Sequence, residues 1–210
     1  MRERISSLYL VAEFVMAKDP LELDPRNALP PQRGRLLVSG PFLPDPYFRR
    51  TVVLLCEHDE EGSFGFVLNR FIDLEIADLV EGFPRINTRI SIGGPVQSGN
   101  LYYLHTLGLR LEGSEEVVAG VFMGGDFEQL RGMLGADPTL ARHLRFFIGY
   151  SGWGKDQLNG EMEQHAWLVG QGTKQRIMNT KRDDLWAQTL RSMGADFAPL
   201  AGFPEDPTLN

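Results

Sequence analysis

The chain has 210 residues, of which 42% are hydrophobic, so it can form a sizeable core and is not a wholly disordered protein. Its 21 basic and 28 acidic residues give a formal net charge of −7, which opposes binding to nucleic acid unless the cations gather on one face. The one cysteine, Cys56, excludes a disulfide within the chain. No apolar stretch approaches the ~20 residues of a membrane-spanning helix, so we expect a cytoplasmic protein with no membrane segment.

The first 33 residues are predicted to be an extension. Residues 8–17 fit a short amphipathic helix, and four prolines from Pro20 to Pro31 then break regular structure. We expect this extension to pack on the domain or on a partner, and residues 34–210 to form a single domain.

Apolar and β-branched runs predict the strands of this domain. Residues 51–56 (TVVLLC) have the composition of a buried strand, and residues 64–68 fit the returning strand of a hairpin. The same signals predict further strands at residues 35–39, 89–92, 101–106, 117–123, 145–148 and 165–169.

Residues that cap helices predict where the helices begin. Gln129, three residues after Asp126, completes a capping-box pattern, and Pro138 suits a first helical position. Helices are therefore expected at residues 74–81 after Asp73, at 127–135 after Asp126, from Pro138 after Asp137, and after Thr180. Because hairpins are mixed among these helices without regular βαβ alternation, the predicted fold class is α+β.

Residues 145–158 (RFFIGYSGWGKDQL) are predicted to form a strand, a glycine loop and a helix. Gly149–Asp156 resembles a phosphate-binding loop, but Asp156 replaces the hydroxyl residue that ligates Mg²⁺, so we expect no nucleotide binding. Ser151 lacks the following glycine of a nucleophile elbow, because Trp153 occupies that position.

Two other chemistries have weak support. Cys56 and His58 would share a face of a regular strand, as in a thiolate–imidazole pair, but the surrounding carboxylates oppose a thiolate, and a structural cysteine is favoured. His58, Asp59 and His105 could converge on a metal, yet no ligand spacing supports this. No carboxylate has the apolar surroundings of a tuned acid–base pair. We expect no metal and no cofactor.

Several ordered motifs together resemble the YqgE/AlgH family of bacterial proteins. The resemblance covers roughly residues 34–195, and Lys155 and Ser151 depart from its common pattern. The motifs are GRLLVSGPFLPDPYFRRTVVLLCEHDEEGSFGFVLNR from Gly34, ISIGGPVQ from Ile90, LYYLHTLG from Leu101, VFMGGDFEQL from Val121 and RFFIGYSGWGKDQLNGE from Arg145.

The resemblance implies a bifurcated, mixed or antiparallel sheet that is curled into a pseudo-barrel with flanking helices. It implies a regulator of transcription or translation without a recognised DNA-binding motif, and no established enzymatic activity. The recurrent polar and turn positions of the family correspond here to His58, Asn69, Arg70, Gly93, Gly94, Pro95, His105, Gly152, Trp153 and Gly154.

We therefore predict a non-enzymatic cytoplasmic protein that has a regulatory role and binds a small ligand or a protein partner. Glycine turns that expose N–H groups beside Arg70 would suit an anionic ligand, although the same glycines could simply shape a curled sheet. The alternatives are a regulator that contacts nucleic acid directly and an unrecognised hydrolase. Sequence-specific binding to nucleic acid is not expected, because the best basic cluster, residues 174–182, is followed at once by Asp183 and Asp184.

Overall fold

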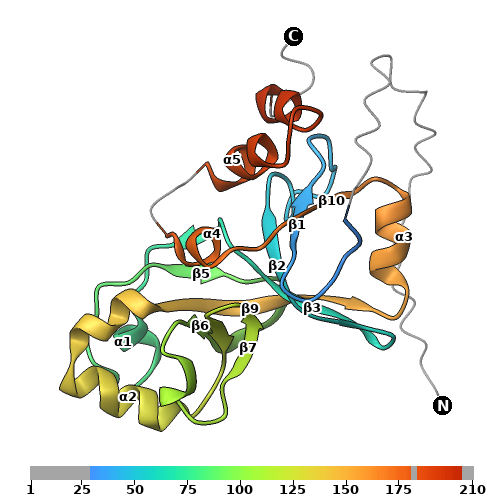
Figure 1. The fold of residues 1–210 in the computed structure, drawn as a ribbon. Coiled ribbons are helices and arrows are strands. Elements are labelled where there is room, and N and C mark those ends of the chain that lie inside the picture. The colour runs from blue at the N-terminus through green and yellow to red at the C-terminus, as the bar shows by residue number, and fades with distance from the viewer. Residues whose placement is uncertain (1–28, 181–183, 205–210) are drawn as a thin grey trace, which may run out of the picture.

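A computed structural model describes residues 29–180 and 184–204, in which helices flank one mixed sheet (Figure 1). The α+β class is confirmed. The expected helix at residues 8–17 lies outside the described residues. The strands are β1 (Leu36–Ser39), β2 (Val52–Asp59), β3 (Gly62–Val67), β4 (Phe71–Ile72), β5 (Ile90–Ile92), β6 (Val96–His105), β7 (Glu115–Val118), β8 (Val121–Met123), β9 (Leu144–Gly154) and β10 (Trp167–Gly170).

The helical elements lie around this sheet. The α-helices are α1 (Ile76–Leu79), α2 (Phe127–Ala136), α3 (Gln157–Glu163), α4 (Lys174–Met178) and α5 (Leu185–Ser192), and 3-10 helices span Gly108–Arg110, Pro138–His143 and Ala198–Gly202. None of the helices in the described ranges is long and apolar enough to cross a membrane.

Strand β9 is the centre of the sheet, whose order is β10-β1-β2-β3-β9-β6-β8-β7. One edge of β9 is shared by two strands: β5 pairs with Phe146–Ile148 in parallel, and β3 pairs with Ser151–Gly154 in antiparallel fashion. The other edge pairs with β6. The sheet is therefore mixed, and it divides along one edge of β9.

The chain crosses β9 between β5 and β6. Phe146 pairs with Ile90 of β5 and with Tyr103 of β6, so these two strands lie on opposite edges of β9. Only Gly93–Pro95 connect them. A Cβ atom on Gly94 would lie 1.9 Å from the carbonyl carbon of Tyr150. The crossing therefore requires a residue without a side chain.

Strand β9 does not end at its first glycine, so the predicted strand–loop–helix arrangement is wrong. The strand continues for 11 residues to Gly154. Gly149 has φ +65° and interrupts the alternation of side chains, so that Phe147 and Tyr150, three residues apart, pack against the same core cluster. Gly149 thus marks an irregularity in β9, opposite the register shift between Val96 and Leu101 of β6.

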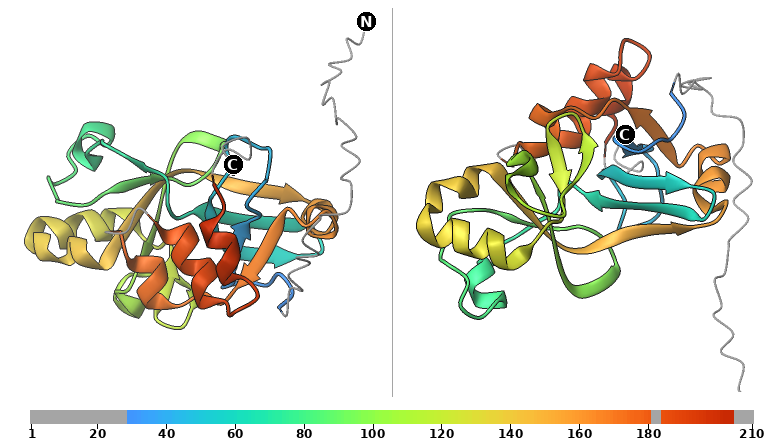
Figure 2. Two further views of the ribbon diagram at one scale, coloured as in Figure 1. Left: turned by 90° about the horizontal axis from the view of Figure 1, so that it is seen from above. Right: turned by 60° about the horizontal axis from the view of Figure 1, so that its bottom comes forward.

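Three apolar clusters cover the two faces of the sheet. The largest lies under α4 and α5, the second under α1 and α2, and the third under α3. Figures 1 and 2 show α2 (yellow) and α3 (orange) at opposite ends of the molecule. Strand β9 contributes Phe147, Phe146 and Trp153 to the three clusters in that order.

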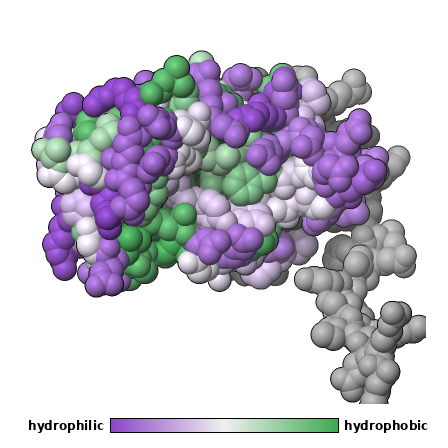
Figure 3. Space-filling view, turned by 90° about the horizontal axis from the view of Figure 1, so that it is seen from below, coloured by the Kyte–Doolittle hydropathy of each residue, from purple (hydrophilic) through white to green (hydrophobic). Residues whose placement is uncertain are grey.

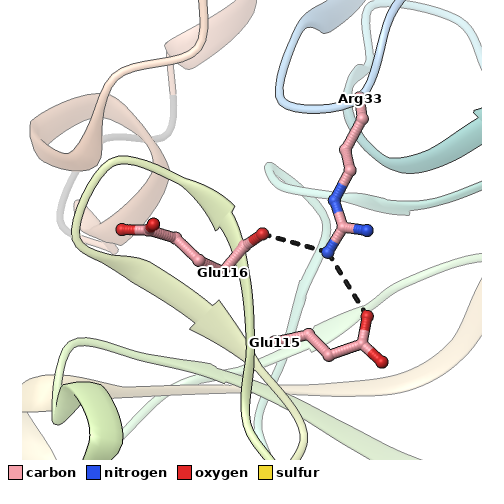
Figure 4. Close-up of polar contacts among 3 residues, drawn as sticks. All are labelled: Arg33, Glu115 and Glu116. Carbon is pink, nitrogen blue, oxygen red and sulfur yellow. Dashed lines mark hydrogen bonds and ion pairs between the residues drawn. The ribbon is translucent and has the colours of Figure 1, made fainter.

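The sheet does not close into a barrel, because its order ends at β10 on one side and β7 on the other. A side chain bridges β7 and the segment before β1. The Arg33 guanidinium donates to the Glu116 carbonyl at 3.0 Å and lies 3.4 Å from the Glu115 carboxylate (Figure 4). The predicted pseudo-barrel is not confirmed. Arg33 also shows that the end of the predicted extension contacts the sheet.

A buried arginine connects three segments. Arg145 is fully buried, and its guanidinium donates to the carbonyls of Leu68 and Ile177 and, at 3.3 Å, to Ser91 Oγ. Burial, and secondarily the charge of Arg89, lowers the pKa of Arg145. A guanidinium remains protonated at neutral pH, so this is a cation held by neutral acceptors.

Several predicted element boundaries need correction. Residues 117–123 form the hairpin β7–β8, because Gly120, with φ +73°, turns the chain. Asp73 does not cap α1, a single turn that follows Glu75 without a side-chain cap. Thr180 does not cap the last helix, which follows Asp184. Helix α4 was not predicted.

Two of the predicted caps are confirmed, but the capping box predicted at Asp126 is only half formed. Asp126 accepts from the Gln129 amide, and Asp137 accepts from the Thr139 amide. Gln129 does not complete the capping box, because its side chain binds the backbone of Glu112 and Arg110.

Replacing Gly94 by alanine should destabilise the fold strongly. The added methyl group would overlap the backbone of β9, and overpacking of this kind typically lowers the free energy of unfolding by ~1–3 kcal/mol or more. Gly99→Ala is the matched control, since in the part of the chain that the structure describes no atom beyond its chain neighbours lies within 4 Å of its Cβ position. Chemical denaturation should separate the two variants, and equal stabilities would contradict the crossing.

Arg145→Lys should also destabilise the protein. One ammonium group cannot reach all three acceptors, and each buried acceptor left unpaired costs about 1–3 kcal/mol. Arg49→Lys, at an exposed arginine, makes the same chemical change as a control. Urea unfolding would measure both, and an unaltered midpoint for Arg145→Lys would refute the role assigned to the guanidinium.

Candidate partner-binding groove

Asn69 and Arg70 stabilise the loop before β2. The Asn69 amide accepts from the Val52 N–H at 2.9 Å and donates to the Arg50 carbonyl at 2.8 Å. The Arg70 guanidinium donates to the carbonyls of Pro46 and Arg49 at 3.3 and 3.2 Å. The cation proposed for an anionic ligand is thus already bound to backbone oxygens.

Gly93, Gly94 and Pro95 form the crossing over β9. The Gly93 N–H donates to the Ile148 carbonyl at 2.8 Å, and both glycines are buried. Gly93 therefore does not present a free N–H group to solvent, as an anion site at this turn would require.

His105 is a buried, neutral histidine. Its Nδ1 accepts from the Leu107 N–H at 3.2 Å, so the proton lies on Nε2, which faces the Gly124 carbonyl at 3.1 Å and Ser114 Oγ at 3.0 Å. Burial lowers the pKa of the imidazole. His105 is part of the packing around β6 and β8, where its ring stacks on Phe122.

A bulge in β2 separates Cys56 from His58. Leu55 pairs with Gly65 and Glu57 pairs with Phe64, so Cys56 is an extra residue and the alternation of side chains shifts. Cys56 packs in the largest core cluster, where burial raises its thiol pKa. His58 instead contacts Ser63 Oγ at 2.7 Å. The expectation of a shared face is therefore wrong, and the structural interpretation of Cys56 holds.

Trp153 belongs to the core under α3. Its indole N–H donates to Glu161 Oε2 at 2.9 Å, and the Trp167 indole N–H donates to the same oxygen at 2.7 Å. One carboxylate on α3 thus fixes two tryptophans, one from β9 and one from β10.

The sequence patterns that resembled a phosphate-binding loop and a nucleophile elbow lie largely within strand β9. Residues Gly149–Gly154 form a strand and not a loop. Ser151 is fully buried, and its hydroxyl donates to the Gly93 carbonyl at 3.0 Å. Among the residues that the structure describes, no group of three or more His, Cys, Asp or Glu is placed to hold a metal ion.

The end of the β2–β3 hairpin and β9 form a groove of about 500 Å³. Its floor follows from the register: Glu57 pairs with Phe64 and Phe64 with Gly152, while Asp59 pairs with Gly62 and Gly62 with Gly154. Each row therefore places a carboxylate on β2 and a glycine on β9. The lining also includes Glu61, Val96, Tyr150 and Trp153.

The groove has an apolar floor and an acidic rim. Phe64 and Tyr150 are half-buried with ring centroids 4.9 Å apart, whereas Glu57, Asp59 and Glu61 are exposed. Figure 3 shows the molecule from below, where apolar areas (green) lie among hydrophilic side chains (purple). Carboxylates beside aromatic rings attract cations through charge and through the ring faces.

The predicted site residues do not gather at one place, and only some of them lie at this groove. Gly152, Trp153 and Gly154 line the groove, and His58 and Gly154 line an adjoining pocket of about 400 Å³. The other predicted residues lie elsewhere: Asn69 and Arg70 between β3 and β4, Gly93, Gly94 and Pro95 at the crossing, and His105 in β6. The prediction missed Glu57, Phe64 and Tyr150, although the run of carboxylates at residues 57–61 was a visible signal.

A larger pocket of about 640 Å³ lies beside β4 and contains Arg85 and Arg89. Arg85 is ion-paired with Glu75 and Asp78, and Arg89 donates to the Thr180 carbonyl at 2.9 Å. Its cations are therefore engaged within the protein, so the acidic groove is the stronger candidate.

His105 should make the protein less stable in mild acid. The unfolded imidazole has a pKa near ~6.5, whereas the folded one titrates lower, so the unfolded chain binds more protons below that pH. The contribution of neutral His105 to the free energy of unfolding should be fully present above pH ~6.5, and it should be lost as the pH falls toward the pKa of His105 in the folded protein. His105→Gln should reduce this pH dependence in thermal unfolding. An unaltered slope in His105→Gln would contradict the assignment.

Comparisons with known proteins agree with the fold and the motifs. The sequence model of the AlgH-like family matches residues 36–198. A UPF0301 protein of Chlorobaculum tepidum is 38% identical over 84% of this chain and 95% of its own length. A UPF0301 protein of Bacteroides thetaiotaomicron is 36% identical over 91% of this chain and 97% of its own.

Two solved structures resemble this one. The AlgH protein of Pseudomonas aeruginosa has a TM-score of 0.65 at 26% identity, covering 82% of this chain and 94% of that one. A Corynebacterium diphtheriae protein has a TM-score of 0.68 at 24% identity, with 83% and 94% covered, which shows a shared fold. By its sequence, the chain belongs to the AlgH-like family.

Proposed function

We propose that this protein has a non-enzymatic, regulatory role in the cytoplasm and binds a partner protein through the acidic groove. The main support is the register of β2, β3 and β9, which aligns Glu57 and Asp59 with the aromatic ring and the glycines on the floor of the groove. A basic segment of the partner can place lysine or arginine side chains against these carboxylates and over the rings of Phe64 and Tyr150.

A protein partner is supported over an anionic ligand. The groove carries three rim carboxylates, which repel phosphate and carboxylate groups. Arg70 and the Gly93 N–H, which an anion would need, are already bound within the fold. The net charge of −7 likewise opposes a role in direct nucleic-acid binding.

The groove is suited to moderate and salt-sensitive binding. Its carboxylates are exposed, so each contact with a cation contributes about 0.2–1 kcal/mol. Ionic strength screens such contacts over a Debye length of ~8 Å at physiological salt. The aromatic floor supplies the part of the binding energy that salt does not remove.

The double variant Glu57→Gln with Asp59→Asn should weaken binding of a basic peptide about five- to tenfold, because two rim charges are lost. The substitutions preserve shape, and the asparagine oxygen can still accept from the Glu61 and Gly62 amides as Asp59 Oδ1 does. Fluorescence anisotropy with lysine- and arginine-containing peptides and charge-reversed versions would measure the effect.

The matched control is Glu81→Gln with Glu163→Gln, which removes two exposed carboxylates away from the groove. It should leave the affinity unchanged. Failure of basic peptides to bind better than acidic ones, or equal losses in both double variants, would overturn the proposed function.

A further inference from the structure

Within the described ranges, the last part of β9 pairs with a strand on one edge only. Strand β6 pairs with β9 only as far as Val96 opposite Tyr150, whereas β3 pairs with Ser151–Gly154 on the other edge. In the part of the chain that the structure describes, no strand pairs with the second edge of Ser151–Gly154. The Gly154 N–H donates to the Gln157 side chain at 3.1 Å, which replaces a partner strand.

This edge is accessible to another backbone, which would replace Gln157 as the acceptor of the Gly154 N–H. Gly152 and Gly154 are exposed, and among the described residues no atom outside the neighbours of Gly154 in the chain lies within 4 Å of a Cβ position on Gly154. Unpaired strand edges can bind an added strand, in which main-chain hydrogen bonds give affinity and alternate side chains give specificity. The groove lies directly beside this edge, because Val96, Tyr150, Gly152 and Gly154 line it.

We propose that an extended basic segment of a partner protein adds as a strand to the Ser151–Gly154 edge of β9. This proposal rests on the proposed function and specifies how the groove is occupied. Glycines without side chains allow the two backbones to approach closely.

The register specifies the spacing of the partner's basic residues. Gly152 shares a row with Phe64 and Glu57, and Gly154 shares the next row with Gly62 and Asp59. These rows are two residues apart along β9, and side chains on one face of a strand recur every second residue. A segment with lysine or arginine at positions i and i+2 therefore places both cations over the two carboxylate rows.

Charge also argues against a second copy of this chain on the edge. The hairpin end carries Glu57, Asp59, Glu60 and Glu61, and the whole chain has a net charge of −7. Pairing two such edges would bring like charges together, which is unfavourable across neighbouring strands.

Peptides with selected backbone amides N-methylated test the strand geometry in the full-length protein. In a β-strand, alternate N–H groups point to the same side, so methylation of one alternating set should weaken binding at least tenfold. Methylation of the other set should have little effect, since those groups face away from β9. Peptides with basic residues at i and i+2 should also bind more tightly than those with the same residues at i and i+3.

A protein variant provides the complementary test. Gly154→Val should occupy the groove beside the edge and weaken binding at least tenfold, while its thermal unfolding midpoint stays near that of the parent, because the Cβ position is free of contacts. Hydrogen exchange of the backbone amides of Gly152 and Gly154, which face this edge, should slow when the i, i+2 peptide binds.

The outcomes separate this proposal from the proposed function. If basic peptides bind but both methylated sets bind equally, strand addition is overturned and binding across the groove face remains. If no basic peptide binds, the proposed function fails as well. Concentration-dependent self-association that Gly154→Val abolishes would show that a second copy occupies the edge, contrary to the proposal.

Discussion

The crossing of the chain over β9 is the constraint on which the arrangement of the sheet depends. Three residues connect strands on opposite edges of β9, and Gly94 lies in backbone contact with Tyr150. Because β5 leaves the edge at this point, β3 can pair with the remainder of β9. The same crossing places Val96, the first residue of β6, opposite Tyr150. The pairing of β6 along β9 therefore ends at Tyr150, and the open edge begins after it.

Two local irregularities then determine which side chains face the groove. Gly149 places Tyr150 in the same cluster as Phe147 and leaves Trp153 for the core under α3. The extra residue at Cys56 pairs Glu57 with Phe64, so a carboxylate follows a core residue on that face. Without either irregularity, the regular alternation of the strands would change the face to which the rim carboxylates and the aromatic floor belong.

The sequence predicted most strands and the family, because apolar β-branched runs and ordered motifs are local signals. It could not predict these irregularities: TVVLLC reads as a regular strand, and only pairing with β3 shows that Cys56 is an extra residue. The glycines of residues 149–154 predicted a loop because glycine is common in loops, yet β3 and β6 hold them in a strand. Arg145 was counted within an apolar strand, and its partners lie up to 77 residues away in the chain.

Gly94, in the motif ISIGGPVQ, and Gly154, in the motif RFFIGYSGWGKDQLNGE, differ in whether the fold requires a glycine. Gly94 is required by packing, since any side chain there would overlap β9. Gly154 is not, since its Cβ position is open and its backbone is extended, a conformation that any residue can adopt. Glycine in a strand weakens it relative to residues that pack, and the described residues give no reason for a glycine at position 154. A surface that receives another backbone supplies such a reason, because the missing side chain leaves room for the added strand.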